Sequence, residues 1–254
     1  MHLSLQIVAI IESMKKQRLD KYIADGLAIT RKEARGLIYQ GHVTINGIGA
    51  TMIDYPVSST DTIACKGETI ACIDGYRYYI LNKLKGYITA DRDTCHKTVM
   101  DLLPPQFSKA GIMPVGRLDM DTTGLLLFTN HGALTYRLLS PKREIKKIYA
   151  AKLDRPITPE DVRQFAVGLD LGDFVTKPAR LYASDISPNH ACVELTEGKY
   201  HQVKRMFEAV GALVLELHRQ CFGPLSIDME IGNYRELRDD EVRSLFASCN
   251  LTEE

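Results

Sequence analysis

The sequence predicts an α+β protein: a small N-terminal module of two helices and short strands, followed by a larger, mixed and mainly antiparallel β-sheet domain flanked by helices. In the module, two segments with helical spacing of apolar residues precede a strand that runs into an Asn46-Gly47 hairpin turn. Beyond it, short strands and helices follow without a regular strand–helix–strand rhythm, which favours an antiparallel sheet over a parallel one. The apolar content of 45% and the charged content of 25% are ordinary for a globular protein.

The 254 residues are enough for one or two domains with an ample core. Residues 58–75 are polar and rich in turn residues, so we place the domain junction near their end. This division predicts an extension over residues 1–13, the small module over residues 14–73 and the larger domain over residues 76–248. The apolar run at residues 5–11 is too short to span a bilayer. It predicts a poorly ordered extension, or else an extra helix turn or strand packed on the module.

The charge of the chain is balanced overall and uneven locally. The 32 basic and 32 acidic residues leave no net charge. Residues 15–35 carry seven basic residues against three acidic ones, whereas residues 228–254 carry eight acidic residues against three basic ones. Opposite-sign segments of this kind fit a local polyanion-binding surface near the N-terminus, with a solvated helix face as the alternative.

The six cysteines are scattered without a C-x-x-C pair. In a chain of this length, that pattern predicts reduced cysteines in the cytoplasm rather than a disulfide framework or a zinc site. Cys95 and His96 are adjacent but lack companions at metal-ligand spacing, so we expect no metal there.

The second predicted helix of the module starts at a capping box, in which Thr30 caps backbone donors and Glu33 reaches back. Arg31 and Arg35 are four residues apart and therefore share an outer face, next to Lys32. The patterns R-L-D-K-Y, T-R-x-x-A-x-x-L-I and G-x-V-x-I-N-G, which begin at positions 18, 30 and 41, resemble the S4-like RNA-binding module. The resemblance implies that Arg31, Lys32 and Arg35 contact phosphates of a structured RNA.

A polar, glycine-bracketed loop at residues 114–124 carries Arg117 and Asp119 and leads into an apolar strand. Catalytic groups often lie on loops of this kind. In an extended segment these two residues point to the same side, where the guanidinium would keep a half-buried carboxylate ionised. The alternative is an ordinary turn in which Asp119 or Thr122 bonds its own backbone. After the strand, we expect Asn130 to cap the next helix.

Three segments of the larger domain form a pattern in order: G-R-L-D-x-x-T-x-G-L-L-L begins at Gly116, K-x-Y at Lys147 and E-G-K-Y-H-Q-V-K-R-M at Glu197. Together with the module before them, they resemble the pseudouridine synthases of the RsuA-like branch across nearly the whole chain. The resemblance implies that a uridine in RNA is isomerised: its base is detached from the ribose at nitrogen, rotated and rejoined through carbon. The reaction involves no net redox change, so the resemblance implies neither a cofactor nor a metal.

The resemblance also assigns roles to single residues. Asp119 is the essential carboxylate, acting as nucleophile or as base on the sugar, and Lys204 pairs with it. Tyr149 lies against the target base, with a core tyrosine as the alternative. Arg117 helps to hold the RNA open, with a structural ion pair as the alternative, and Asp121 is expected in turn bonding or in solvent. Further basic residues expected to contact RNA are Lys146, Lys147 and Arg205.

The expected function is that of an rRNA pseudouridine synthase, an isomerase acting on a specific uridine of small-subunit (16S) ribosomal RNA. The alternatives are a uridine of large-subunit (23S) RNA or, without activity, an RNA-binding ribosome-assembly factor. The end Leu251-Thr252-Glu253-Glu254 differs from the long basic tails of many large-subunit relatives, which favours the small subunit. The expected partner is ribosomal RNA in a small-subunit assembly intermediate. We expect a monomer in the cytoplasm, without a membrane partner.

Overall fold

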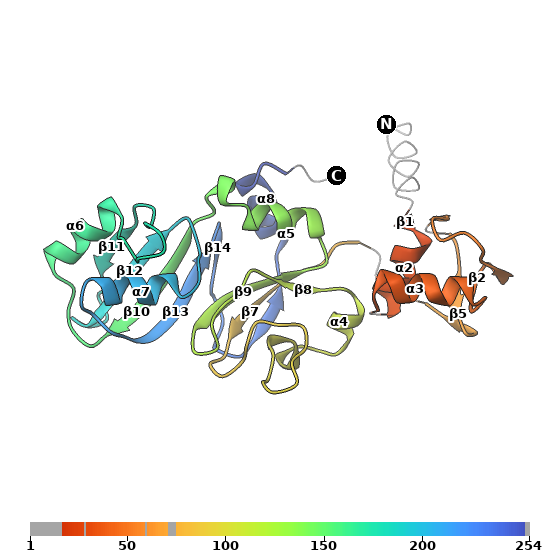
Figure 1. The fold of residues 1–254 in the computed structure, drawn as a ribbon, viewed down its shortest axis with the longest axis horizontal. Helices are drawn as coiled ribbons and strands as arrows, with labels where there is room; N and C mark the ends of the chain where they lie inside the picture. Colours follow the sequence, from red (N-terminus) through yellow and green to blue (C-terminus); the bar gives the residue numbers. More distant parts are fainter. Residues whose placement is uncertain (1–16, 28, 59, 71–74, 252–254) are drawn as a thin grey trace. The chain divides into compact units, whose positions relative to one another are not determined.

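The computed structural model describes residues 17–251 apart from residues 28, 59 and 71–74, so the extension expected over residues 1–13 lies outside the described residues. The chain forms two compact units (Figure 1). The first reaches to Tyr76 and includes Pro105–Gly111; the second comprises Arg77–Pro104 and Ile112–Glu254. The change of unit after Tyr76 lies beside the junction expected from the sequence, whereas the assignment of Pro105–Gly111 to the first unit was not expected.

The first unit combines helices with short antiparallel strands. Its elements are β1 (Gln17–Arg18), α2 (Leu19–Leu27), α3 (Arg31–Tyr39), β2 (Val43–Ile45), β3 (Ile48–Gly49), β4 (Pro56–Val57), β5 (Ile63–Cys65), β6 (Glu68–Thr69) and α4 (Gln106–Lys109). The predicted capping box of α3 is present: the backbone N–H of Glu33 donates to the hydroxyl of Thr30, and that of Thr30 donates to the Glu33 carboxylate. Asn46 and Gly47 have φ angles of 52° and 81°, which form the predicted turn between β2 and β3.

The second unit is built on a nine-stranded sheet. Its elements are β7 (Tyr78–Lys83), the 3-10 helix η1 (Val99–Leu102), β8 (Met113–Val115), β9 (Thr123–Thr129), α5 (Gly132–Leu139), the 3-10 helix η2 (Pro141–Arg143), β10 (Lys147–Leu153), α6 (Pro159–Val167), β11 (Arg180–Ala183), β12 (His190–Leu195), α7 (Gln202–Ala209), β13 (Val214–Phe222), β14 (Leu225–Ser226), β15 (Tyr234–Glu236) and α8 (Asp239–Ser248). The strand order is β11-β12-β10-β13-β9-β7-β15, with β14 beside β13 and β8 beside β9. Only β9 and β13 pair in parallel among these described strands, so the predicted mainly antiparallel sheet is confirmed.

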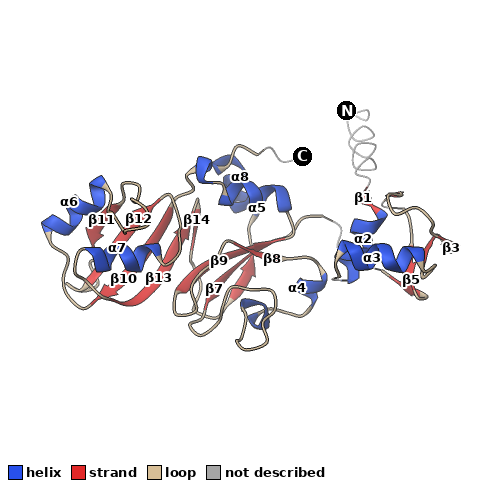
Figure 2. Ribbon diagram, viewed as in Figure 1, coloured by secondary structure: helices blue, strands red, loops and turns tan. Residues whose placement is uncertain are grey.

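Helices cover the sheet of the second unit at two places (Figure 2). Helices α5 and α8 share a buried cluster with β9, to which Leu138, Leu245 and Leu127 contribute. Helices α6 and α7 meet through the rings of Phe165 and Phe207, whose centroids lie 5.1 Å apart. No helix in the described part of the chain is long and apolar enough to cross a bilayer.

The start of α5 differs from the prediction. We expected Asn130 to cap this helix, but α5 begins at Gly132, and His131 occupies the cap position without a side-chain cap bond. The side-chain oxygen of Asn130 instead accepts from the backbone N–H of Arg77 at 2.8 Å. Because β7 and β9 pair antiparallel, the end of β9 lies beside the start of β7, and Asn130 joins the two.

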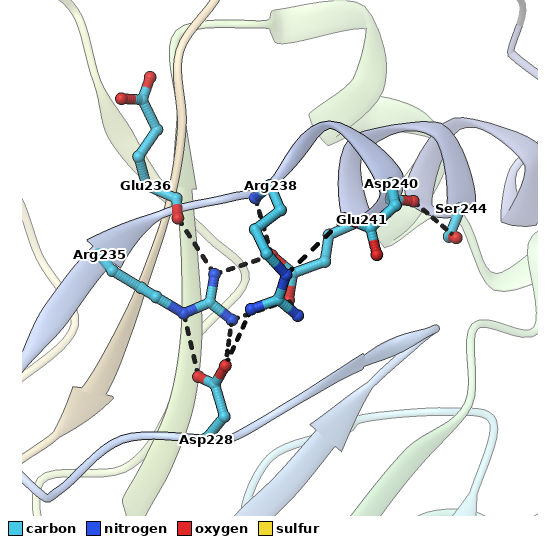
Figure 3. Close-up of polar contacts among 7 residues, drawn as sticks. All are labelled: Asp228, Arg235, Glu236, Arg238, Asp240, Glu241 and Ser244. Carbon is cyan, nitrogen blue, oxygen red and sulfur yellow. Dashed lines mark hydrogen bonds and ion pairs between the residues drawn. The ribbon is translucent and has the colours of Figure 1, made fainter.

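Charged side chains tie α8 to β15 and to the loop before it (Figure 3). Arg235 of β15 donates to both carboxylate oxygens of Glu241 at 2.7 Å, and to those of Asp228 at 3.0 and 2.7 Å. Glu241 also accepts from the backbone N–H of Arg238 at 2.8 Å, which caps the first turn of α8. The hydrogen bonds from Arg235 hold the pKa of Glu241 below its ordinary value, so the pair stays ionised at neutral pH.

Candidate active site

The loop at residues 116–122 lies between β8 and β9 and is held by neighbouring backbone. The hydroxyl of Thr89 donates to the carbonyl oxygen of Leu118 at 2.8 Å and accepts from its N–H at 3.0 Å. After the loop, Gly124 has a φ angle of +106°, and a Cβ there would lie 2.3 Å from the carbonyl oxygen of Arg219. Glycine is therefore required where β9 approaches β13, and that approach fixes the end of the loop.

Lys83, the last residue of β7, lies fully buried beneath this loop. Its ammonium group donates to four backbone carbonyl oxygens at 2.9–3.4 Å, those of Leu84, Asp119, Met120 and Thr122. Burial lowers the pKa of Lys83 to about 8. These bonds fix the backbone at Asp119 and at the loop residues that follow it. Lys83 was not among the predicted site residues; its signal in the sequence is a lysine that closes an otherwise uncharged strand.

Two carboxylates of the loop share one lysine of α7. The Nζ atom of Lys204 lies 3.2 Å from Oδ2 of Asp119 and 2.6 Å from Oδ1 of Asp121. The side chains of Asp119 and Lys204 are 30% and 23% exposed, so solvent screens this pair only in part. The expected contact of Asp119 with Lys204 is present. Asp121, expected in turn bonding or in solvent, has a side chain that is 57% exposed and that also pairs with Lys204.

These contacts decide the charge of Lys204. Burial pulls the pKa of Lys204 down, but its hydrogen bonds to Asp121 and Asp119 outweigh burial and raise that pKa above its ordinary value. Burial likewise pushes the pKa of Asp121 up, but the hydrogen bond from Lys204 holds it below its ordinary value. Lys204 is therefore a cation beside Asp119 at neutral pH.

Strand β10 and the start of α7 supply the remaining walls of the site. Tyr149 of β10 is only 8% exposed and lines the same cleft as Asp119. His201, the cap residue of α7, has a left-handed backbone conformation with φ 48° and ψ 27°. Its Nε2 atom lies 3.5 Å from Oδ1 of Asp119. Non-glycine residues in this conformation are uncommon and cluster at functional sites, where strain positions a side chain.

The cleft has a volume of about 70 Å3 and is open to solvent. Its walls include Arg117, Asp119, Tyr149, His201 and Lys204, all from the second unit. The site thus combines a carboxylate, a cation and an aromatic ring around one concave space. Among the described residues, no group of three or more His, Cys, Asp or Glu side chains is arranged to hold a metal ion.

The basic residues predicted to contact RNA have different surroundings. Arg117 is exposed at the cleft, and Lys146 pairs with Glu194 at 2.8 Å. Lys147 is half-buried; its Nζ donates to the carbonyl oxygen of Ile145 at 2.7 Å. Burial and the neighbouring charge of Arg219 lower the pKa of Lys147 to about 8. Lys147 is therefore only partly available to solvent, and its contact with RNA stays a prediction.

Arg205 joins α7 to the loop at residues 170–175. Its guanidinium donates to the carbonyl oxygen of Leu171 at 2.9 Å and pairs with the carboxylate of Asp173. Arg205 and Lys199 both lie over the ring of Phe174, at 5.3 and 3.5 Å from its centroid. Arg205 thus fastens a loop beside the site, and its contact with RNA stays a prediction.

In the first unit, three arginines surround the fully buried Asp20. Arg31 donates to both of its oxygens at 2.9 Å, Arg35 donates to one at 2.9 Å, and Arg18 donates at 3.2 and 3.4 Å. Burial would raise the pKa of Asp20, but these hydrogen bonds hold it well below its ordinary value. One carboxylate thereby orients three cations whose side chains are 43–49% exposed, while Lys32 is exposed nearby on α3.

Both units of this chain match known protein families. The family described as RNA pseudouridylate synthase matches residues 77–209, and the S4 domain matches residues 17–63. Ribosomal small subunit pseudouridine synthase A of Escherichia coli is 37% identical over 232 residues, which are 90% of this chain and 99% of that protein. The RNA pseudouridine synthase YtzG of Bacillus subtilis is 38% identical over 90% of this chain and 98% of its own. A crystal structure of a pseudouridylate synthase superposes with a TM-score of 0.64 and 34% identity, over 90% of this chain and 99% of that one.

Proposed function

Because the chain belongs to the RNA pseudouridylate synthase family, we propose that it isomerises a specific uridine of small-subunit (16S) ribosomal RNA to pseudouridine. The convergence of Asp119, Lys204 and Tyr149 in one cleft is the observation that supports this reaction. The choice of the small subunit follows the relatives named for it, which this chain matches over nearly their whole length.

The reaction replaces the bond from C1′ of the ribose to N1 of the base with a bond from C1′ to C5. The proton lost from C5 is balanced by one gained at N1, so no oxidant or reductant takes part. In this proposal the Asp119 carboxylate attacks the ribose or removes a proton from it. Lys204 places a positive charge beside that carboxylate, and the Tyr149 ring lies against the detached base while it rotates.

The RNA is held by cations of both units in this proposal. Arg31, Arg35 and Lys32 contact phosphates of structured RNA, and the buried Asp20 keeps the two arginines oriented. In the second unit the phosphate contacts come from Lys146, Lys147 and Arg205, and Arg117 helps to hold the RNA open. Moving the target base out of its stack costs a few kcal/mol, which such contacts offset. We further propose that the enzyme acts as a monomer in the cytoplasm, on an assembly intermediate of the small subunit.

The carboxylate assignment is tested by a matched pair of variants, Asp119→Asn and Asp121→Asn, because both residues bond Lys204 and only one has the proposed role. We expect Asp119→Asn to abolish pseudouridine formation without loss of RNA affinity. Asp121→Asn should retain activity within about tenfold, since it removes one partner of Lys204 and not the reacting group. Equal activities of the two variants would refute the assignment.

The target is tested by chemical mapping of pseudouridine in ribosomal RNA from cells with and without this protein. A single small-subunit site that disappears with the protein is the expected result. Loss of a large-subunit site would redirect the proposal to that RNA. An unchanged map, together with rRNA binding by the purified protein, would favour an inactive assembly factor.

A further inference from the structure

Tyr200 stands beside the cleft as an exposed aromatic residue with one ring face covered. Its ring stacks on that of His201, with centroids 3.9 Å apart and planes 14° from parallel. Tyr200 is 76% exposed, so its other face is turned to solvent. His201 in turn places Nε2 3.5 Å from Asp119. One imidazole ring thus separates the exposed tyrosine from the carboxylate at the centre of the site.

The backbone holds this stack in place. His201 has its left-handed conformation immediately before α7, and the next residue, Gln202, is buried and donates to Glu197. The backbone N–H of Lys199 donates to the side-chain oxygen of Gln202 at 2.9 Å. The short segment that carries Tyr200 is therefore fastened on both sides. A ring held in this way loses little conformational freedom when a further ring stacks on it.

We propose that the exposed face of Tyr200 stacks the base of a nucleotide next to the target uridine, and so helps to select the RNA sequence or conformation around it. This inference rests on the proposed function, because it concerns how that same site holds its RNA. Exposed aromatic rings beside cationic grooves are the usual partners of unstacked bases in single-stranded RNA. Lys199, the residue before Tyr200, lies with its ammonium over the ring of Phe174 and supplies positive charge for the adjacent RNA phosphates, whereas the charge of Arg205 over the same ring is offset by Asp173.

The chain offers a matched control for this residue. Tyr136 of α5 lies in the same unit, is 78% exposed and does not line the cleft. The experiment compares Tyr200→Leu, Tyr200→Phe and Tyr136→Leu with the wild type, using a synthetic RNA that spans the mapped target. We expect Tyr200→Leu to raise Kd and KM by about tenfold, the effect of losing one stacked base. Tyr200→Phe, which keeps the ring, and Tyr136→Leu should bind like the wild type.

Abasic substrates separate stacking from a structural role. Each nucleotide flanking the target is replaced in turn by an abasic one. At one flanking position, removal of the base should lower the RNA affinity of the wild type by about tenfold. The same removal should not lower the affinity of Tyr200→Leu further, because the stacked pair is already broken in this variant. The inference is overturned if Tyr200→Leu binds the intact RNA as tightly as the wild type does. It is also overturned if Tyr200→Leu binds the intact RNA and every abasic RNA more weakly than the wild type by the same factor.

Affinity is also measured for the whole series in the Asp119→Asn background. A wild-type protein that binds the RNA without modifying it would refute the proposed function. In that case the abasic series still decides whether Tyr200 stacks a base, so the two failures are distinguishable.

Discussion

The ammonium nitrogen of Lys204 lies 3.2 Å from Oδ2 of Asp119, although helix α7 carries the lysine and the loop before β9 carries the aspartate. At an effective dielectric constant of about 20, a contact of this kind is worth roughly 4 kcal/mol before desolvation is subtracted. The lysine also bonds Asp121, so its charge is shared between two carboxylates. We therefore expect the rate of isomerisation to depend on Lys204, although Lys204 forms or breaks no bond in the proposed reaction.

Replacing Lys204 with Met should lower the rate of isomerisation by about a hundredfold, because a charged group that stabilises the reacting state is removed. The single-turnover rate of pseudouridine formation measures this effect, and filter binding measures the RNA affinity, which should change little. Lys152→Met is the control, since Lys152 forms an exposed pair with Glu216 and lies outside the cleft. An undiminished rate in Lys204→Met would remove this lysine from the mechanism.

Replacing Lys83 with Met should reduce both stability and rate, because four backbone carbonyl groups around Asp119 lose a buried cationic donor. The free energy of unfolding should fall by about 2 kcal/mol at pH 7. The folded pKa of about 8 lies below the ordinary value of 10.5. The unfolded chain therefore binds more protons between these values, and the contribution of Lys83 to stability rises with pH in that window.

Urea unfolding of wild type and Lys83→Met at pH 7 and pH 9.5 tests this dependence. The difference in the free energy of unfolding should grow by on the order of 1–2 kcal/mol at the higher pH. Lys147 titrates in the same range, but it is present in both proteins and cancels in the difference. A difference that is the same at both pH values would contradict the burial of a charged Lys83.

The pKa of about 8 for Lys147 predicts a pH-dependent affinity for RNA. If Lys147 contacts a phosphate, it must be charged in the complex, so the affinity should fall as pH rises through about 8. Titrations of RNA binding from pH 7 to pH 9 measure this trend. Lys147→Met should bind more weakly at pH 7 and lose this part of the pH dependence. Lys146→Met, which removes the neighbouring cation, should keep it; identical profiles for both variants would show that Lys147 does not contact RNA.

The contacts of Glu241 predict a pH-dependent anchor for α8. Glu241→Gln removes charge-assisted hydrogen bonds to Arg235 and should lower the free energy of unfolding by about 2 kcal/mol at pH 7. Because the folded pKa of Glu241 lies below the ordinary 4.5, its contribution is present above that pH and is lost as pH falls through the folded pKa. Urea unfolding at pH 7 and pH 4 should therefore show a smaller difference at pH 4.

The matched control for this variant is Glu160→Gln on α6. Glu160 forms an exposed pair with Arg163 one turn away, and solvent screening leaves such a pair little effect on stability. An effect of Glu241→Gln no larger than that of Glu160→Gln would contradict the anchoring role of the network in Figure 3.

Several elements could be predicted because their signals are local. Thr30 starts α3 with a capping box whose partner, Glu33, is three residues away. Asn46 and Gly47 form a turn between adjacent strands, and the apolar run after Gly124 is a strand with its interior buried. The start of α5 was missed because the side chain of Asn130 bonds the backbone of Arg77, just before β7, and no local pattern reveals this contact.

The sequence by itself determined the fold class, the family resemblance and the identity of the residues proposed to act, since motifs and helix or strand signals depend on neighbours along the chain. Only the tertiary structure decided that Lys83 supports the loop, that Asp121 shares Lys204 and that His201 faces Asp119 beneath Tyr200. These contacts join segments far apart in the chain. They depend on sheet order and on the parallel pairing of β9 with β13, which bring side chains within bonding distance irrespective of their spacing in sequence.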